Sequence, residues 1–150
     1  MTSLIETNRV LVPTDFSKDA MDAQAKTLDF VGDASHLYIL HVLPSLWPGE
    51  PGITWNTVDD DTRKANVEKT FREQCSGPEY EGVHFEVKIG DPSSEIIDFA
   101  GANDINLIVI PSHGRTGMKR FLMGSVADRI VRFAKCPVLV LHRSDSSDAP

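Results

Sequence analysis

Two short apolar runs near the end of the chain, residues 107–110 and 138–141, constrain the fold more than any other stretch. Both are rich in β-branched residues, and each has the length of a fully buried strand. Glycines and then a helical pattern lie between them. We expect Ser125 to cap this helix, with Asp128 three residues later, and Pro137 to stop it. The apolar stripe expected to face the sheet consists of Val126, Ile130 and Phe133. Strand, glycine loop, helix and strand form a βαβ unit, and its loop lies at the strand end where open parallel sheets bind ligands.

The same region carries an excess of positive charge. Residues 111–143 contain seven Lys or Arg and a single acidic residue, although the whole chain has a net charge of −7. The basic residues are Arg115, Lys119, Arg120, Arg129, Arg132, Lys135 and Arg143. A helix N-terminus, glycines that let a ligand approach the backbone, and nearby cations can together form a phosphate site. A solvated basic helix face after an ordinary loop would give the same pattern, so charge and glycines leave both interpretations open.

Upstream of this unit, apolar runs that indicate strands alternate with helical patterns. The expected strands span residues 10–12, 37–43 and 83–89, and the expected helices span about 18–31, 59–75 and 92–101. Ser17 suits the N-cap of the first helix and Gly32 its C-terminal cap, and Met21, Ala25 and Leu28 are expected on one face. The order βαβαβαβαβ predicts a single α/β domain with an open, parallel, five-stranded, Rossmann-like sheet and helices on both faces.

Asp15 follows the first strand and should lie at the same sheet edge as the glycine loop. An Asp in this position is commonly a turn residue or a secondary helix cap. It is also suited to accept hydrogen bonds from a ligand hydroxyl such as that of a ribose. The local sequence does not separate the two interpretations.

Composition and motifs exclude several classes of protein. No apolar run approaches the roughly 20 residues that span a bilayer, and residues 1–8 lack the pattern of a secretory signal. We therefore expect a cytoplasmic protein without a membrane partner. The acidic balance argues against nucleic acid. The five histidines show no metal-ligand spacing, so no metal site is predicted. Ser112 and His113 suggest a nucleophile and a base, but no third group is evident and no catalytic residue is assigned.

One set of motifs resembles a known family. Pro111, Ser112, His113 and Gly114, then nine residues, then Gly124 and Ser125 resemble the signature G-x-x-G-x9-G-[S/T] of universal stress proteins. Further similar motifs are residues 12–17 (VPTDFS), the strand end 40–42 (LHV), residues 90–92 (GDP) and residues 136–140 (CPVLV). The resemblance covers residues 8–143. It implies one nucleotide-binding domain over residues 1–143, followed by a polar tail, residues 144–150, that we expect to be flexible.

The resemblance also implies a ligand, ATP with or without Mg²⁺, and a role in the stress response. In this family the backbone at Val42 would meet the adenine and Asp15 the ribose, while Gly114, Gly124 and Ser125 would hold the phosphates. The residues implied in cofactor binding are Pro13, Thr14, Asp15, Val42, Ile110, Pro111, His113, Gly114, Arg115, Gly124, Ser125, Val126 and Ala127. The first glycine of the signature is Pro111 here, and proline has no N–H to donate.

Three functions stay open at this point. They are a module that binds ATP without rapid catalysis, a slow ATPase, and a homodimeric interaction module that has lost nucleotide binding. The resemblance implies a homodimer, and the last strand, residues 138–141, would be an apolar edge that a second copy could cover.

Overall fold

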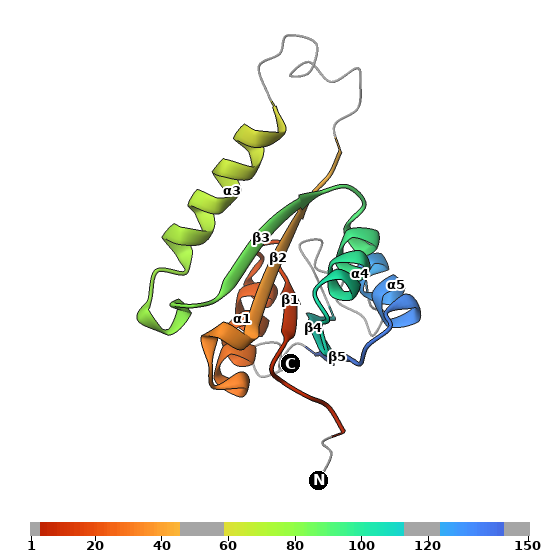
Figure 1. Cartoon of the computed structure of the whole chain (residues 1–150). Coiled ribbons are helices and arrows are strands. Elements are labelled where there is room, and N and C mark those ends of the chain that lie inside the picture. Colours follow the sequence, from red (N-terminus) through yellow and green to blue (C-terminus); the bar gives the residue numbers. More distant parts are fainter. Residues whose placement is uncertain (1–3, 46–58, 113–123, 143–150) are drawn as a thin grey trace, which may run out of the picture.

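The computed structural model describes residues 4–45, 59–112 and 124–142 of the 150-residue chain. Its strands are β1 (Val10–Pro13), β2 (Leu37–Leu43), β3 (His84–Ile89), β4 (Leu107–Pro111) and β5 (Val138–Leu141). Its helices are α1 (Lys18–Val31), α3 (Asp60–Gln74), α4 (Pro92–Ala102) and α5 (Ser125–Phe133), with short 3₁₀ turns η1 (Ala34–His36) and η2 (Pro78–Tyr80) (Figure 1). Strands and helices alternate along the chain as predicted. The expected tail, residues 144–150, lies outside the described residues.

All five strands are parallel and lie in the order β3-β2-β1-β4-β5. After β1, the strands β2 and β3 are added on one side of it, and β4 and β5 are then added on the other side. β1 pairs with β2 as far as Pro13, opposite Leu40, but its pairing with β4 ends at Leu11, opposite Ile108. The carboxyl ends of β1 and β4 are thus not paired with each other, and this reversal of strand order is where ligands bind in open α/β sheets.

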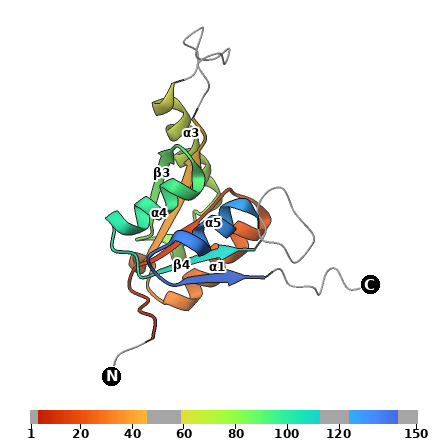
Figure 2. The same ribbon diagram turned by 90° about the vertical axis from the view of Figure 1, so that its right-hand side faces the viewer.

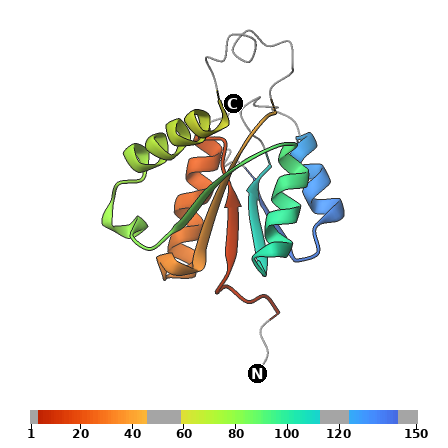
Figure 3. The same ribbon diagram turned by 45° about the horizontal axis from the view of Figure 1, so that its top comes forward.

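Helices cover both faces of the sheet, as the sequence predicted. Figure 3 shows α1 and α3 on one side and α4 and α5 on the other. Alternate residues of the central strands face opposite layers: Leu11, Leu40 and Ile108 pack with α4 and α5, and Val12 and Ile39 pack with α1. Both faces of the central strands are apolar because both are buried, which explains their continuous apolar runs.

The ends of α1 and α4 follow their sequence signals. The Ser17 hydroxyl accepts from the Ala20 N–H, and Gly32 ends α1 with φ 72°, a left-handed conformation that glycine adopts without strain. Asp91 caps α4, and Pro92 occupies its first turn. The predicted face of α1 is buried only in part, because Leu28 packs against the core but Ala25 is exposed. The buried residues are instead Ala20, Ala23, Gln24 and Thr27.

Two predictions about α5 were also wrong. Ser125 is the first helical residue, and Gly124 occupies the N-cap position without a capping side chain. The predicted stripe is only partly buried: Ile130 is 1% exposed, but Val126 is 38% and Phe133 61% exposed. The face that packs on the sheet instead repeats at three and four residues, and it consists of Ala127, Ile130 and Ala134. Among the described residues no helix is long and apolar enough to cross a membrane.

Candidate functional site

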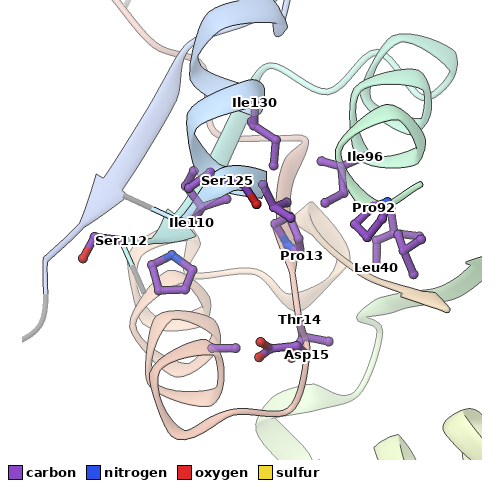
Figure 4. A pocket seen from close by; sticks show the side chains of 16 residues that line it. Pro13, Thr14, Asp15, Leu40, Pro92, Ile96, Ile110, Ser112, Ser125 and Ile130 are labelled. Carbon is purple, nitrogen blue, oxygen red and sulfur yellow. The ribbon is translucent and has the colours of Figure 1, made fainter. Parts of the chain in front are cut away.

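A cavity of about 360 Å³ opens at the carboxyl edge of the sheet, between β1, β2 and β4 and the helices α4 and α5. Its volume lies within the range of small-molecule sites. Figure 4 shows Thr14 and Asp15 on one side, Ser125 on another, and Pro92 and Ile96 on the α4 side. The cavity therefore occupies the position where the strand order reverses.

The turn between β1 and α1 supplies the polar side chains on one side. Thr14 is buried, and its hydroxyl accepts from the Phe16 N–H at 3.1 Å. Asp15 is half-buried, and its Oδ1 accepts from the Ser17 N–H at 2.9 Å. The carboxylate of Asp15 thus acts as a secondary cap of α1 while it also lines the cavity. The two interpretations that the sequence left open are compatible in the structure.

The N-terminus of α5 supplies backbone N–H groups on another side. Gly124, Ser125, Val126 and Ala127 all line the cavity. The first N–H groups of a helix have no partner within the helix, and no described side chain caps this end. The partial positive charge of the helix dipole is therefore directed to the cavity.

Gly124 adds space at this helix end. Its φ of −62° and ψ of 161° are accessible to any residue, and a Cβ at this position would meet no atom within 4 Å. Neither backbone conformation nor packing in the described part of the chain requires glycine here. The missing side chain leaves the backbone open to the cavity.

The N-terminus of α4 lies beside the site and is electrostatically tied to α5. Asp91 Oδ2 accepts from the Ser94 N–H at 3.0 Å and from the Ser93 hydroxyl at 2.9 Å, and it lies 3.6 Å from Arg129 Nη1. The Ser94 hydrogen bond, then Ser93, and finally the charge of Arg129 lower the pKa of Asp91. Arg129 of α5 thus pairs with the carboxylate that caps α4.

The structure brings together every predicted site residue that it describes. Those residues are Pro13, Thr14, Asp15, Val42, Ile110, Pro111, Gly124, Ser125, Val126 and Ala127, and all ten line the cavity. His113, Gly114 and Arg115 lie outside the described residues. Sequence reasoning missed several lining residues, namely Ala20, Leu40, Pro92, Ile96, Ser112 and Ile130. Most of these are apolar, and their pattern indicated core packing, so no local signal marked them as cavity walls.

The lining sets limits on the chemistry. The walls are mostly apolar, and the polar groups are Thr14, Asp15, Ser112, Ser125 and the N–H groups of α5. No cluster of three metal-ligating side chains occurs in residues 4–45, 59–112 and 124–142. Ser112 is buried, and its backbone N–H donates to the Leu141 carbonyl at 2.9 Å. The site suits a ligand with an apolar ring, hydroxyl groups and an anionic end.

Known proteins are similar to this chain over most of its length. The model of the universal stress protein family matches residues 6–142. The universal stress protein MJ0577 of Methanocaldococcus jannaschii is 30% identical over 156 residues, which cover 92% of this chain and 96% of the relative.

Solved structures share the fold. UspA from Lactobacillus plantarum superimposes with a TM-score of 0.71 at 23% identity, covering 91% of this chain and 98% of that one. A universal stress protein in complex with cAMP superimposes with a TM-score of 0.67 at 20% identity, covering 93% and 100%. At these identities the likeness extends to the α/β fold with its parallel sheet.

Proposed function

The chain belongs to the universal stress protein family, and from this premise we propose that its cavity binds an adenine nucleotide, with ATP as the principal ligand. The proposal is that the protein binds the nucleotide in a stress-related, regulatory role and does not turn it over rapidly. A related fold has been solved with cAMP, an adenine nucleotide, which supports the ligand class.

The observation that carries this proposal is the N-terminus of α5 at Gly124, which no described side chain caps. An anion suits this position because the N–H groups and the dipole favour negative charge. The glycine is not needed for the backbone or for packing against described residues, whereas a phosphate would need the space that it leaves. Asp15 lies across the cavity and can accept from ribose hydroxyls, and Val42 lies beside the apolar region suited to adenine.

The roles proposed for individual residues follow from these positions. The phosphates would meet Gly124, Ser125 and the backbone of Val126 and Ala127, together with Gly114 in the segment outside the described residues. The ribose would lie near Thr14 and Asp15, and Pro13, Ile110 and Pro111 would form the wall between the two. His113 and Arg115 are proposed to contribute from the same undescribed segment. Mg²⁺, if it binds, would arrive with the phosphates, because the described residues offer no metal cluster.

The test uses a substitution whose effects on stability and on binding have opposite signs. Gly124→Ser places a capping hydroxyl on the N–H groups of α5, so it should stabilise the fold by about 0.3 kcal/mol. The same hydroxyl competes with the phosphates, so the affinity for ATP should fall. Gly101→Ser is the matched control, because a Cβ at Gly101 would likewise meet no atom within 4 Å, and Gly101 lies on α4, outside the cavity lining.

Binding is measured by calorimetry with ATP, ADP and AMP, and stability by urea unfolding. We expect affinity to increase with phosphate number in the unsubstituted protein, to fall in Gly124→Ser and to stay unchanged in Gly101→Ser. Absence of binding to all three nucleotides at millimolar concentration would contradict the proposal and favour the interaction module. Phosphate release above that of the Gly124→Ser variant would favour the slow ATPase.

We also propose a homodimer that forms through β5. β5 is an edge of the sheet, and the carbonyls of Pro137 and Leu141 point to β4. The backbone groups of Val138 and Val140 therefore face outward, since neighbouring residues of a strand alternate in direction. Two large apolar side chains in this part of the chain are exposed, Leu139 on β5 and Phe133 on α5. The helix α5 directly precedes β5 in the chain (Figure 2). A second copy would cover this edge. The cytoplasmic location and the absence of nucleic-acid and membrane partners stay predictions.

A further inference from the structure

We infer that His41 positions Asp15 for the nucleotide by holding the β1–α1 turn from the opposite face of the sheet. This inference rests on the proposed function. Leu40 and Val42, the neighbours of His41 in β2, line the cavity, whereas His41 does not. Successive side chains of a strand point to opposite faces, so the His41 ring lies on the α1 side.

The central contact is a hydrogen bond to the backbone of Thr14. His41 Nδ1 lies 2.8 Å from the Thr14 carbonyl oxygen. A carbonyl oxygen only accepts, so Nδ1 is the donor and carries the proton. The Thr14 N–H in turn donates to the Leu40 carbonyl at 2.8 Å. Two consecutive residues of β2 therefore hold both backbone polar groups of the residue that precedes Asp15.

The turn that His41 holds has an unusual backbone conformation. Phe16 has φ 61°, in the left-handed region that residues other than glycine rarely adopt. The hydrogen bonds from Phe16 N–H to Thr14 and from Ser17 N–H to Asp15 are local to the turn. His41 adds two contacts from another element, β2. One is its hydrogen bond to Thr14, and the other is its ring, whose centroid lies 5.1 Å from that of the Phe16 ring with an interplanar angle of 39°. Such a conformation persists when the surrounding structure fixes it.

Two substitutions separate the hydrogen bond from the bulk of the side chain. Asn carries its amide nitrogen near the position of the imidazole Nδ1, so His41→Asn can keep a donor to Thr14. Gln carries its amide nitrogen farther out, near the position of Nε2, so His41→Gln loses that donor while staying polar and similar in size. If His41 had a purely structural role, each substitution would lower the stability in proportion to the side-chain volume removed, and the affinity for every ligand would fall equally.

The experiment measures affinities for ATP and for 2′,3′-dideoxy-ATP, which lacks the ribose hydroxyls that Asp15 would bind. His41→Gln should lower the affinity for ATP by about three- to tenfold, which corresponds to the loss of one ordinary hydrogen bond. It should leave the affinity for dideoxy-ATP unchanged, because this ligand lacks the ribose hydroxyls that Asp15 would bind. His41→Asn should bind ATP within about threefold of the unsubstituted protein. A ligand-independent arm is the ¹H–¹⁵N NMR spectrum of the unsubstituted ring, which should show the proton on Nδ1.

Each outcome decides the inference. Equal weakening of both ligands by His41→Gln, or no weakening of either, overturns the positioning role while nucleotide binding stands. Equal affinity of the unsubstituted protein for ATP and dideoxy-ATP overturns the link to the ribose, again without affecting nucleotide binding as such. No ATP binding by the unsubstituted protein overturns the proposed function and this inference with it. If His41→Gln does not fold, the NMR arm decides: a neutral ring protonated only on Nε2 overturns the hydrogen bond.

Discussion

Replacing Pro111 should strengthen nucleotide binding, and the strand register gives the reason. The N–H groups of Ile108 and Ser112 donate to carbonyls of the chain around β5, at Pro137 and Leu141. Backbone groups alternate in direction along a strand, so the backbone of residue 111 is directed to the other side, toward β1. The β1–β4 pairing has ended there, and the cavity lies at that point. An N–H at position 111 would therefore be directed into the proposed site, but proline has none.

The magnitude follows from two opposing contributions. A restored hydrogen bond to a charged phosphate contributes about 1.5–3 kcal/mol. Pro111→Gly also increases the freedom of the unliganded chain, which costs about 1 kcal/mol. The difference, about 0.5–2 kcal/mol, corresponds to roughly two- to thirtyfold tighter binding. Pro111→Ala restores the same donor with a smaller gain in backbone freedom, so it should bind ATP at least as tightly as Pro111→Gly.

Calorimetry with ATP and with adenosine tests the reasoning. Because the added donor would meet a phosphate, both variants should gain affinity for ATP and not for adenosine. An equal gain for adenosine would show that the substitutions reshape the apolar wall. Unchanged ATP affinity in both variants, with circular dichroism showing folded protein, would refute the assignment of a phosphate position next to residue 111.

Three further predictions concern stability and assembly. Gly32→Ala should destabilise the fold by about 1 kcal/mol in urea unfolding because φ is 72° there, whereas Gly101→Ala, in the helix α4, should be neutral or stabilising. The pKa of Asp91 is lower in the folded state, so the unfolded chain binds a proton at this carboxyl more readily. The ionised carboxylate therefore contributes to stability above the ordinary pKa of 3.8, and this contribution is lost as pH falls through the folded-state pKa. Asp91→Asn should accordingly flatten the acid side of the pH–stability profile, and an unaltered profile would contradict this. Light scattering at tens of micromolar should show a dimer, and Val140→Pro should yield a folded monomer because the Val140 N–H points away from β4; an unchanged dimer would exclude β5 as the interface.

The exposed ion pair between Asp91 and Arg129 has a limited role in this picture. Both side chains are about half exposed, so solvent screens their attraction and the pair contributes little to stability. Its consequence is geometric, because it links the N-cap of α4 to the second turn of α5. Asp91 is held mainly by the Ser94 and Ser93 hydrogen bonds, which cap α4 independently of Arg129.

The sequence alone determined the elements and their order. Apolar runs located all five strands, and Ser17, Gly32 and Pro92 marked helix ends, because capping and periodicity act between residues a few positions apart. The order of elements also gave the parallel sheet with two helical layers, since crossover connections admit few alternatives. The resemblance carried by residues 12–17, 40–42 and 111–125 supplied the expected ligand and the predicted site residues, which periodicity could not give.

Only the tertiary structure decided which faces are buried and which residues meet. On α5 Ala127 and Ile130 pack on the sheet, whereas Val126 and Phe133 are exposed, and on α1 the polar Gln24 is buried. Asp15, Val42 and Gly124 lie far apart in the sequence and meet because β1, β2 and β4 end at one edge. His41 was a strand residue without a marked role until its Nδ1 was found against the Thr14 carbonyl. These features depend on contacts between distant segments, and a local pattern holds no information about which partner will be packed against it.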